Sequence, residues 1–135
     1  MESESAEGEA RVQSEHDIVL ARQLVRRLTQ GLAFSLVDQT KMVTAASELA
    51  RNTLIYGRGG TMHWHRRSES GRQGLTLTFV DSGPGIPNLE LAMSDGWTSG
   101  NGLGMGLSGA RRLVNEFAIE SQVGKGTRVS ITRWK

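Results

Sequence analysis

The sequence predicts an α+β fold, a two-layer sandwich in which about three helices cover one face of a mostly antiparallel, mixed sheet. Two observations support this prediction. Apolar residues recur at helical spacing over three segments, and the segments after residues 60 and 116 alternate in polarity around short polar turns. The chain has 135 residues, which is enough to bury one core, so residues 11–135 are expected to form a single domain.

The N-terminal third of the chain contains a tail and two helices. Residues 1–10 are acidic and aperiodic, and we expect them to form a flexible tail. The first helix is expected from Ile18, with Asp17 capping its start and Gly31 ending it. A longer second helix follows a capping box formed by Ser35 and Asp38, and its apolar stripe is Val43, Ala46, Ala50 and Leu54, up to Gly57.

The rest of the chain alternates strands with one helix. TMHWHRR and QGLTLTFVD indicate two strands joined by a polar turn, and Leu75, Leu77 and Phe79 are expected on one face. Residues 82–106 are rich in glycine, serine and asparagine, so a long functional loop is predicted. A third helix is expected to carry the stripe Leu107, Ala110, Val114 and Phe117, before a hairpin formed by FAIESQV, GKG and TRVSITRW.

Composition narrows the class of protein. No cysteine is present and no apolar run has the length of a membrane span, so a cytoplasmic protein without membrane association is expected. Residues 1–10 hold four Glu and no Lys or Arg, so the other 125 residues hold all 16 basic but only 10 of the 14 acidic side chains. This surplus of six positive charges suits an anionic ligand or an acidic partner. Nucleic acid is not expected, because the basic residues are scattered and aromatic residues are few.

Two segments place acidic or amide side chains beside apolar ones. Glu48 and Asn52 are four residues apart and therefore share a face of the second helix. They form either a solvated face or a site in which Asn52 offers an oxygen to Mg²⁺ and Glu48 acts as a general base. Asp81 ends a strand and precedes Ser-Gly-Pro-Gly, which is typical of a plain turn, or of an acceptor for the amine of adenine in a pocket that glycines open.

Two further segments are rich in glycine. Residues 100–107 lead into a helix, so their backbone N–H groups are suited to a phosphate. The pattern G-x-G-x-x-G from Gly104 to Gly109 has no strand before it, which disfavours a Rossmann site, and no Walker loop is present. Residues 124–127, GKGT, are interpreted on their own as a structural hairpin turn.

In this order and spacing, the four segments resemble the N, G1, G2 and G3 boxes of the GHKL superfamily of ATPases and kinases. The phrases SELARN, DSGPGI, GLGMGLSGARRLVNEF and GKGT are similar to those of the small anti-sigma-type serine/threonine kinases, and among these to the stressosome switch kinases. The resemblance covers most of residues 12–134 and implies the Bergerat ATP-binding fold.

The resemblance also implies roles for individual residues. Glu48 would be the catalytic carboxylate, Asn52 would coordinate Mg²⁺ and Asp81 would bind adenine. Residues with a nucleotide-binding role would be Asn52, Asp81, Gly83, Gly85, Ile86, Gly102, Leu103, Gly104, Met105, Gly106, Leu107 and Thr127.

The implied activity is transfer of the γ-phosphoryl group of Mg-ATP to a serine or threonine of a STAS-domain antagonist protein. Phosphorylation would then release the kinase to bind a second partner, such as a phosphatase. Two alternatives stay open: an anti-sigma factor kinase that binds a sigma factor directly, and a non-catalytic ATP-binding module that acts by protein contact.

Overall fold

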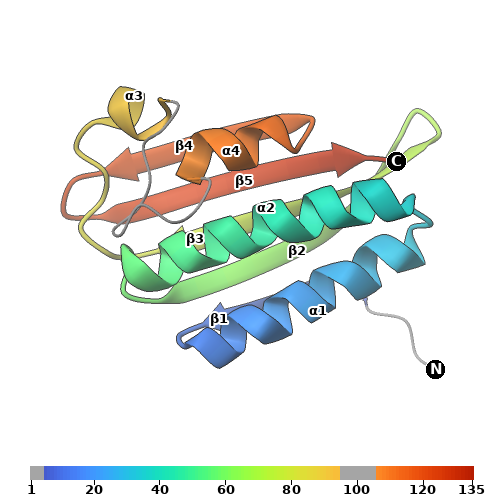
Figure 1. Cartoon of the computed structure of the whole chain (residues 1–135), viewed down its shortest axis with the longest axis horizontal. Coiled ribbons are helices and arrows are strands. Elements are labelled where there is room, and N and C mark those ends of the chain that lie inside the picture. Colours follow the sequence, from blue (N-terminus) through green and yellow to red (C-terminus); the bar gives the residue numbers. More distant parts are fainter. Residues whose placement is uncertain (1–4, 95–105) are drawn as a thin grey trace.

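A computed structural model describes residues 5–94 and 106–135, and it shows helices packed on one face of a single sheet (Figure 1). The five strands lie in the order β1-β2-β3-β5-β4, and every neighbouring pair is antiparallel. The α+β sandwich is therefore confirmed, but the described sheet is antiparallel throughout and not mixed. In chain order the elements are β1 (Glu7–Val12), α1 (Glu15–Gly31), α2 (Leu36–Ile55), β2 (Gly60–Glu69), β3 (Arg72–Asp81), α3 (Leu89–Ala92), α4 (Gly106–Arg112), β4 (Glu116–Gln122) and β5 (Gly126–Trp134).

The core lies between the helices and the inner face of the sheet. The predicted apolar stripes of α1 and α2 are buried except for Leu54, which is partly buried, and they face alternate residues of β2, β3 and β5. Leu75, Leu77 and Phe79 share this face as expected, and each is at most 1% exposed. Burial of each such side chain contributes about 1.5–3 kcal/mol, so this layer holds β3 against the helices.

The two long helices begin with side-chain caps. Ser35 caps α2 as predicted, because its Oγ accepts the N–H of Asp38 at 3.1 Å. For α1 the predicted cap was wrong. Ser14 is the N-cap and accepts the N–H of Asp17 at 3.1 Å, while the Asp17 carboxylate accepts the N–H of Gln13 at 2.9 Å. Asp17 therefore lies inside the first turn and completes a reciprocal cap.

The prediction of a flexible tail over residues 1–10 was wrong for residues 7–10, which belong to β1. This edge strand pairs with β2 from Glu7 opposite His65 to Val12 opposite Gly60. Its polar residues face solvent and its small residues face inward, so the segment has alternation but almost no apolar signal. Residues 1–4 lie outside the described part of the chain.

Helix α4 is shorter than predicted, and Phe117 belongs to β4 rather than to the helix. The reason is a polar junction at Asn115. Its N–H donates to the carbonyl of Thr132 at 2.9 Å, and its side-chain oxygen accepts the N–H of Trp134 at 2.7 Å. These bonds join the chain to β5 at this point and end the helical path.

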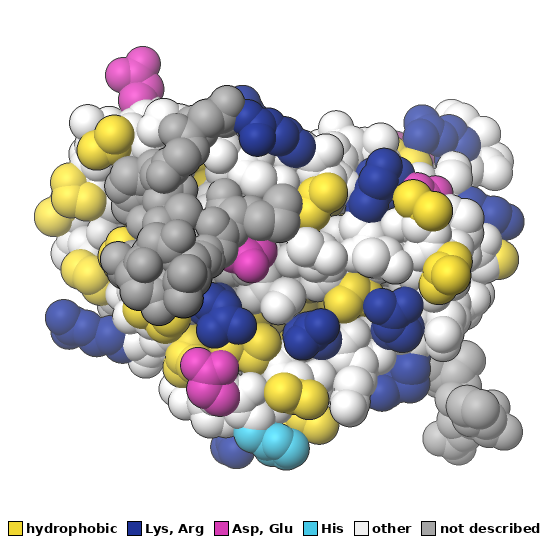
Figure 2. Space-filling model, in the orientation of Figure 1, with side chains coloured by type: hydrophobic (Ala, Val, Ile, Leu, Met, Phe, Trp, Pro, Cys, Tyr) yellow, Lys and Arg dark blue, Asp and Glu magenta, His cyan; other side chains and the backbone are white. Residues whose placement is uncertain are grey.

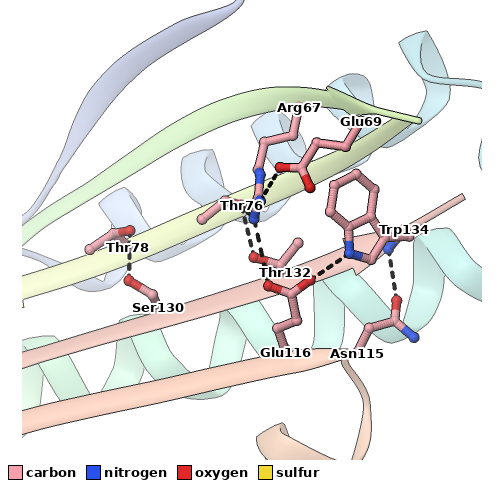
Figure 3. Close-up of polar contacts among 9 residues, drawn as sticks. All are labelled: Arg67, Glu69, Thr76, Thr78, Asn115, Glu116, Ser130, Thr132 and Trp134. Atoms are coloured by element: carbon pink, nitrogen blue, oxygen red, sulfur yellow. Dashed lines mark hydrogen bonds and ion pairs between the residues drawn. The ribbon is translucent and has the colours of Figure 1, made fainter. Parts of the chain in front are cut away.

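The two faces of the sheet differ in chemistry. On the face without helices, hydroxyl pairs link β3 to β5: Thr76 with Thr132 at 2.7 Å and Thr78 with Ser130 at 3.0 Å (Figure 3). On the opposite, helix-covered side, Lys and Arg side chains are widely spread and Asp and Glu are sparse (Figure 2). None of the helices in the described ranges 5–94 and 106–135 is long and apolar enough to cross a membrane.

Candidate functional site

An apolar pocket opens between α2, α4 and the ends of β3 and β5. It is closed on one side by the loop that follows β3. Six of the residues predicted to bind nucleotide lie around this one pocket, although they come from five separate parts of the chain. The lining residues are Leu49, Asn52, Thr53, Tyr56, Gly57, Phe79, Asp81, Gly85, Ile86, Pro87, Leu107, Thr127 and Val129.

The polar floor of the pocket is formed by Asp81 and Thr127, and Ser121 on the next strand continues their row beyond the lining residues. Asp81 on β3 lies directly opposite Thr127 on β5, and Thr127 lies directly opposite Ser121 on β4. Directly opposite residues of antiparallel strands project from the same face with Cβ atoms about 4.5–5.5 Å apart. The row continues the inner face of Phe79 and Val129, so it lies on the side of the helices.

The Asp81 carboxylate is held at the end of β3 by its own turn. Its Oδ1 accepts the backbone N–H of Gly83 at 3.0 Å. The walls around it are largely apolar, and Leu49 and Phe79 are each 1% exposed. A carboxylate at the base of an apolar slot is suited to a flat ring that carries a hydrogen-bond donor on one edge. Adenine carries such a donor, its exocyclic amine, and therefore fits this slot.

Close backbone contact shapes the pocket at Gly57. A Cβ atom at Gly57 would collide with the Asp81 carboxyl group, and a Cβ atom at Gly83 would lie 2.7 Å from the Cα of Gly57. The turn after α2 and the turn after β3 therefore touch through glycine backbone. Gly83 itself lies beside the pocket without lining it, whereas Gly85, with φ at +80°, lines it.

Asn52 and Glu48 occupy one side of α2, one turn apart, as their spacing predicts. Asn52 lines the pocket and is half-buried, and its backbone carbonyl accepts the N–H groups of Tyr56 and Gly57 at the end of the helix. Glu48 is also half-buried but is not among the lining residues of the pocket. The structure thus separates an amide at the pocket wall from a carboxylate one turn away from it.

The structure describes only the last residues of the predicted glycine-rich segment, Gly106 and Leu107. The predicted phosphate-binding residues Gly102, Leu103, Gly104 and Met105 lie outside the described residues. Gly106, with φ at +69°, begins α4, and Leu107 is buried against the pocket. The β-hairpin turn GKGT is placed as predicted, with Thr127 just inside β5.

Several residues of the candidate site were not predicted from the sequence. Ser121 has the most contacts: its Oγ accepts the N–H of Ile86 at 2.7 Å and lies 2.8 Å from Oγ1 of Thr127. Counting back along the predicted hairpin from Thr127 gives Ser121 as its partner, so strand register was the available signal. Ser121 supports two lining residues without lining the pocket itself, and the lining residues that were not predicted are Leu49, Thr53, Tyr56, Gly57, Phe79, Pro87 and Val129.

Comparison with known proteins gives consistent relatives. Residues 37–135 match the family model described as histidine kinase-, DNA gyrase B-, and HSP90-like ATPase. The serine/threonine-protein kinase RsbT of Bacillus subtilis is 42% identical over 124 residues, which are 92% of this chain and 93% of RsbT. An anti-sigma F factor of Clostridium acetobutylicum is 34% identical over 69% of this chain and 66% of its own length.

A solved structure shares the fold. The RsbU and RsbW domains of a Mycobacterium tuberculosis protein match 96% of this chain with a TM-score of 0.66 and 17% sequence identity. This chain spans about a third of that longer protein, since the match covers 32% of it.

Proposed function

This chain belongs to the histidine kinase-, DNA gyrase B- and HSP90-like ATPase family, and on that premise we propose that it is an ATP-dependent protein serine/threonine kinase. Its similarity to RsbT over nearly the whole of both chains supports kinase activity. We further propose that it acts in the cytoplasm as a switch between protein partners in bacterial stress signalling.

The observation that supports nucleotide binding most strongly is the Asp81 carboxylate in its apolar slot. A carboxylate is an acceptor only, so it suits the exocyclic amine of adenine and opposes a ring carbonyl at that position. The apolar walls would cover the faces of the ring, and the missing side chain at Gly57 leaves the carboxylate in place. In this role Gly83, Gly85, Ile86 and Thr127 complete the adenine end.

The phosphate end of the site rests on α2 and on the glycine-rich loop. We propose that Asn52 holds Mg²⁺ through its side-chain oxygen, a ligand type that this ion accepts. When bound, the metal supplies neutralisation of phosphate charge. Glu48 accepts the proton of the attacking hydroxyl from its place one turn along the helix. The phosphate-binding segment would be Gly102, Leu103, Gly104, Met105, Gly106 and Leu107.

The proposed protein substrate is a STAS-domain antagonist, and a phosphatase activated by binding is the proposed second partner. Phosphorylation adds a charge of about −1.5 to −2 to the antagonist, which is enough to break a packed interface. A second candidate function is an anti-sigma factor kinase that binds a sigma factor directly. The anti-sigma F factor relatives support this candidate. A non-catalytic ATP-binding module remains the third alternative.

The experiment uses the purified chain, γ-labelled ATP with Mg²⁺, and the STAS-domain proteins encoded by the same organism. We expect label on a serine or threonine of one STAS protein and none in reactions without the chain. ATP binding without transfer to any STAS protein would favour the non-catalytic module. Co-purification with sigma factor in place of STAS and phosphatase partners would favour the anti-sigma function.

A further inference from the structure

Ser121 has three hydrogen-bonding contacts at a single oxygen. Its Oγ lies 2.7 Å from the backbone nitrogen of Ile86, 3.1 Å from the carbonyl oxygen of Gly126 and 2.8 Å from Oγ1 of Thr127. Ile86 belongs to the loop after β3, whereas Gly126 and Thr127 begin β5. The hydroxyl of Ser121 therefore joins both segments that frame the floor of the pocket.

These contacts determine where the two hydroxyl protons lie. A serine hydroxyl donates one hydrogen bond and accepts two. The N–H of Ile86 can only donate and the carbonyl of Gly126 can only accept, so Ser121 accepts the first and donates to the second. Its remaining lone pair is then available to Thr127, which must donate its own proton. This is the one assignment in which all three contacts are hydrogen bonds.

This proton arrangement decides which hydrogen-bonding groups Thr127 presents to the pocket. With its proton directed at Ser121, the Thr127 oxygen presents only lone pairs to a ligand. Asp81, directly opposite on β3, also presents only acceptors. We propose that Ser121 is a positioning residue that fixes Thr127 as an acceptor, so that the pocket selects a purine with an amino group at this edge. The proposal rests on the nucleotide site proposed above and specifies how that site selects its base.

Two nucleotides separate this role from a merely structural one. ATP carries an amino group at ring position 6, whereas ITP carries an oxo group there. The oxo group meets two acceptors in the wild-type pocket and is disfavoured. In Ser121→Ala, Thr127 loses its acceptor and its hydroxyl is free to donate to the oxo group. The ratio of the ITP to the ATP dissociation constant should therefore fall by about three- to tenfold, the effect of one net hydrogen bond.

The test measures both dissociation constants by calorimetry for the wild type, Ser121→Ala, Ser121→Thr and a matched control. Ser121→Thr keeps the hydroxyl and should keep the wild-type ratio. The control is Ser130→Ala, which removes a Ser–Thr hydroxyl pair, with Thr78, on the face away from the pocket (Figure 3). It should leave the ratio unchanged.

A wild-type ratio retained in Ser121→Ala, with both affinities weakened equally, would show that Ser121 only supports the loop and would overturn the inference alone. If wild type fails to bind ATP, the proposed function fails with it. Should Ser121→Ala not fold, Thr127→Val answers the same question. It should weaken ATP and spare ITP, and adding Ser121→Ala to it should change the ratio no further; equal weakening of both nucleotides would contradict the proposal.

Discussion

Arg133, near the end of β5, donates from Nη2 to the Oδ1 of Asp38 in the first turn of α2 at 2.6 Å, across 95 residues of sequence. Its Nη1 also donates to the carbonyl of Leu113, just after α4, at 2.8 Å. One guanidinium therefore connects the sheet to the two helices that border the pocket. The side chains are 15% and 28% exposed, so solvent screens this pair only in part.

Arg133 holds the pKa of Asp38 below its ordinary value of 3.8, and the Ser35 cap adds to this effect. Because the pKa is lowered in the folded state, the stabilisation is complete above the ordinary pKa and is lost as pH falls through the lowered one. Asp38→Asn should reduce the free energy of unfolding at pH 7 by about 1–3 kcal/mol. Urea unfolding should show the difference from wild type shrinking toward pH 3, and a constant difference would contradict the linkage.

Asp81→Asn tests the adenine end of the pocket. An amide can still accept the N–H of Gly83, but it loses the charge and can present a donor to the ring amine. We expect ATP affinity to fall by about ten- to a hundredfold with the fold intact, as measured by calorimetry. Glu120→Gln removes a carboxylate from an exposed position on β4 and serves as the control. Unchanged affinity in Asp81→Asn would make the adenine assignment wrong.

Glu48→Ala separates binding from chemistry, because Glu48 does not line the pocket that Asn52 lines. ATP affinity should survive, whereas phosphoryl transfer should fall by about 10²–10⁴-fold if Glu48 is the general base. Single-turnover transfer of labelled phosphate measures the loss, and Glu90→Ala, at an exposed position on α3, is the matched control. Transfer at the wild-type rate would remove Glu48 from the role of base.

Gly57→Ala tests the backbone contact beside Asp81. The added Cβ would collide with the Asp81 carboxyl group, which must move away from its present position. ATP affinity should drop at least about tenfold, since the carboxylate contributes a charge-assisted hydrogen bond. In the control Gly31→Ala, the nearest atom is Nη2 of the flexible Arg66 side chain at 3.3 Å, so affinity should be unaffected. Equal behaviour of the two variants would show that the contact at Gly57 is unimportant.

Sequence periodicity predicted the elements whose one face is strongly apolar. Leu75 and Leu77 alternate with threonines, and the long stripe of α2 repeats at helical spacing, so both were placed correctly. Strand β1 was missed because its inward residues include Gly8 and Ala10, which give almost no hydrophobic signal. The sequence places Phe117 in a helix because it follows Val114 at a helical spacing of three residues, while the polar junction at Asn115 decides otherwise.

The residues of the candidate site also fall into two groups, those that the sequence predicts and those that it does not. Asp81 and Thr127 were found because each lies in a short glycine-containing segment of recognisable order. Ser121 and Gly57 carry no such signal, since one depends on the register of β4 against β5 and the other on the approach of two turns. The predicted hairpin gives the register of β4 against β5, so Ser121 could be derived from the sequence by counting, whereas the close approach of the two turns at Gly57 appears only in the folded chain.

Strand β1 also protects its neighbour. It covers the backbone of β2 from Gly60 to His65, and the chain just before it contributes the carbonyl of Ser5, to which the indole N–H of Trp64 donates at 3.3 Å. A chain shortened to begin at Gln13 would expose that edge and that ring together. Open edges recruit strands from other molecules, so the acidic N-terminal segment is expected to keep the protein from self-association and precipitation at high concentration.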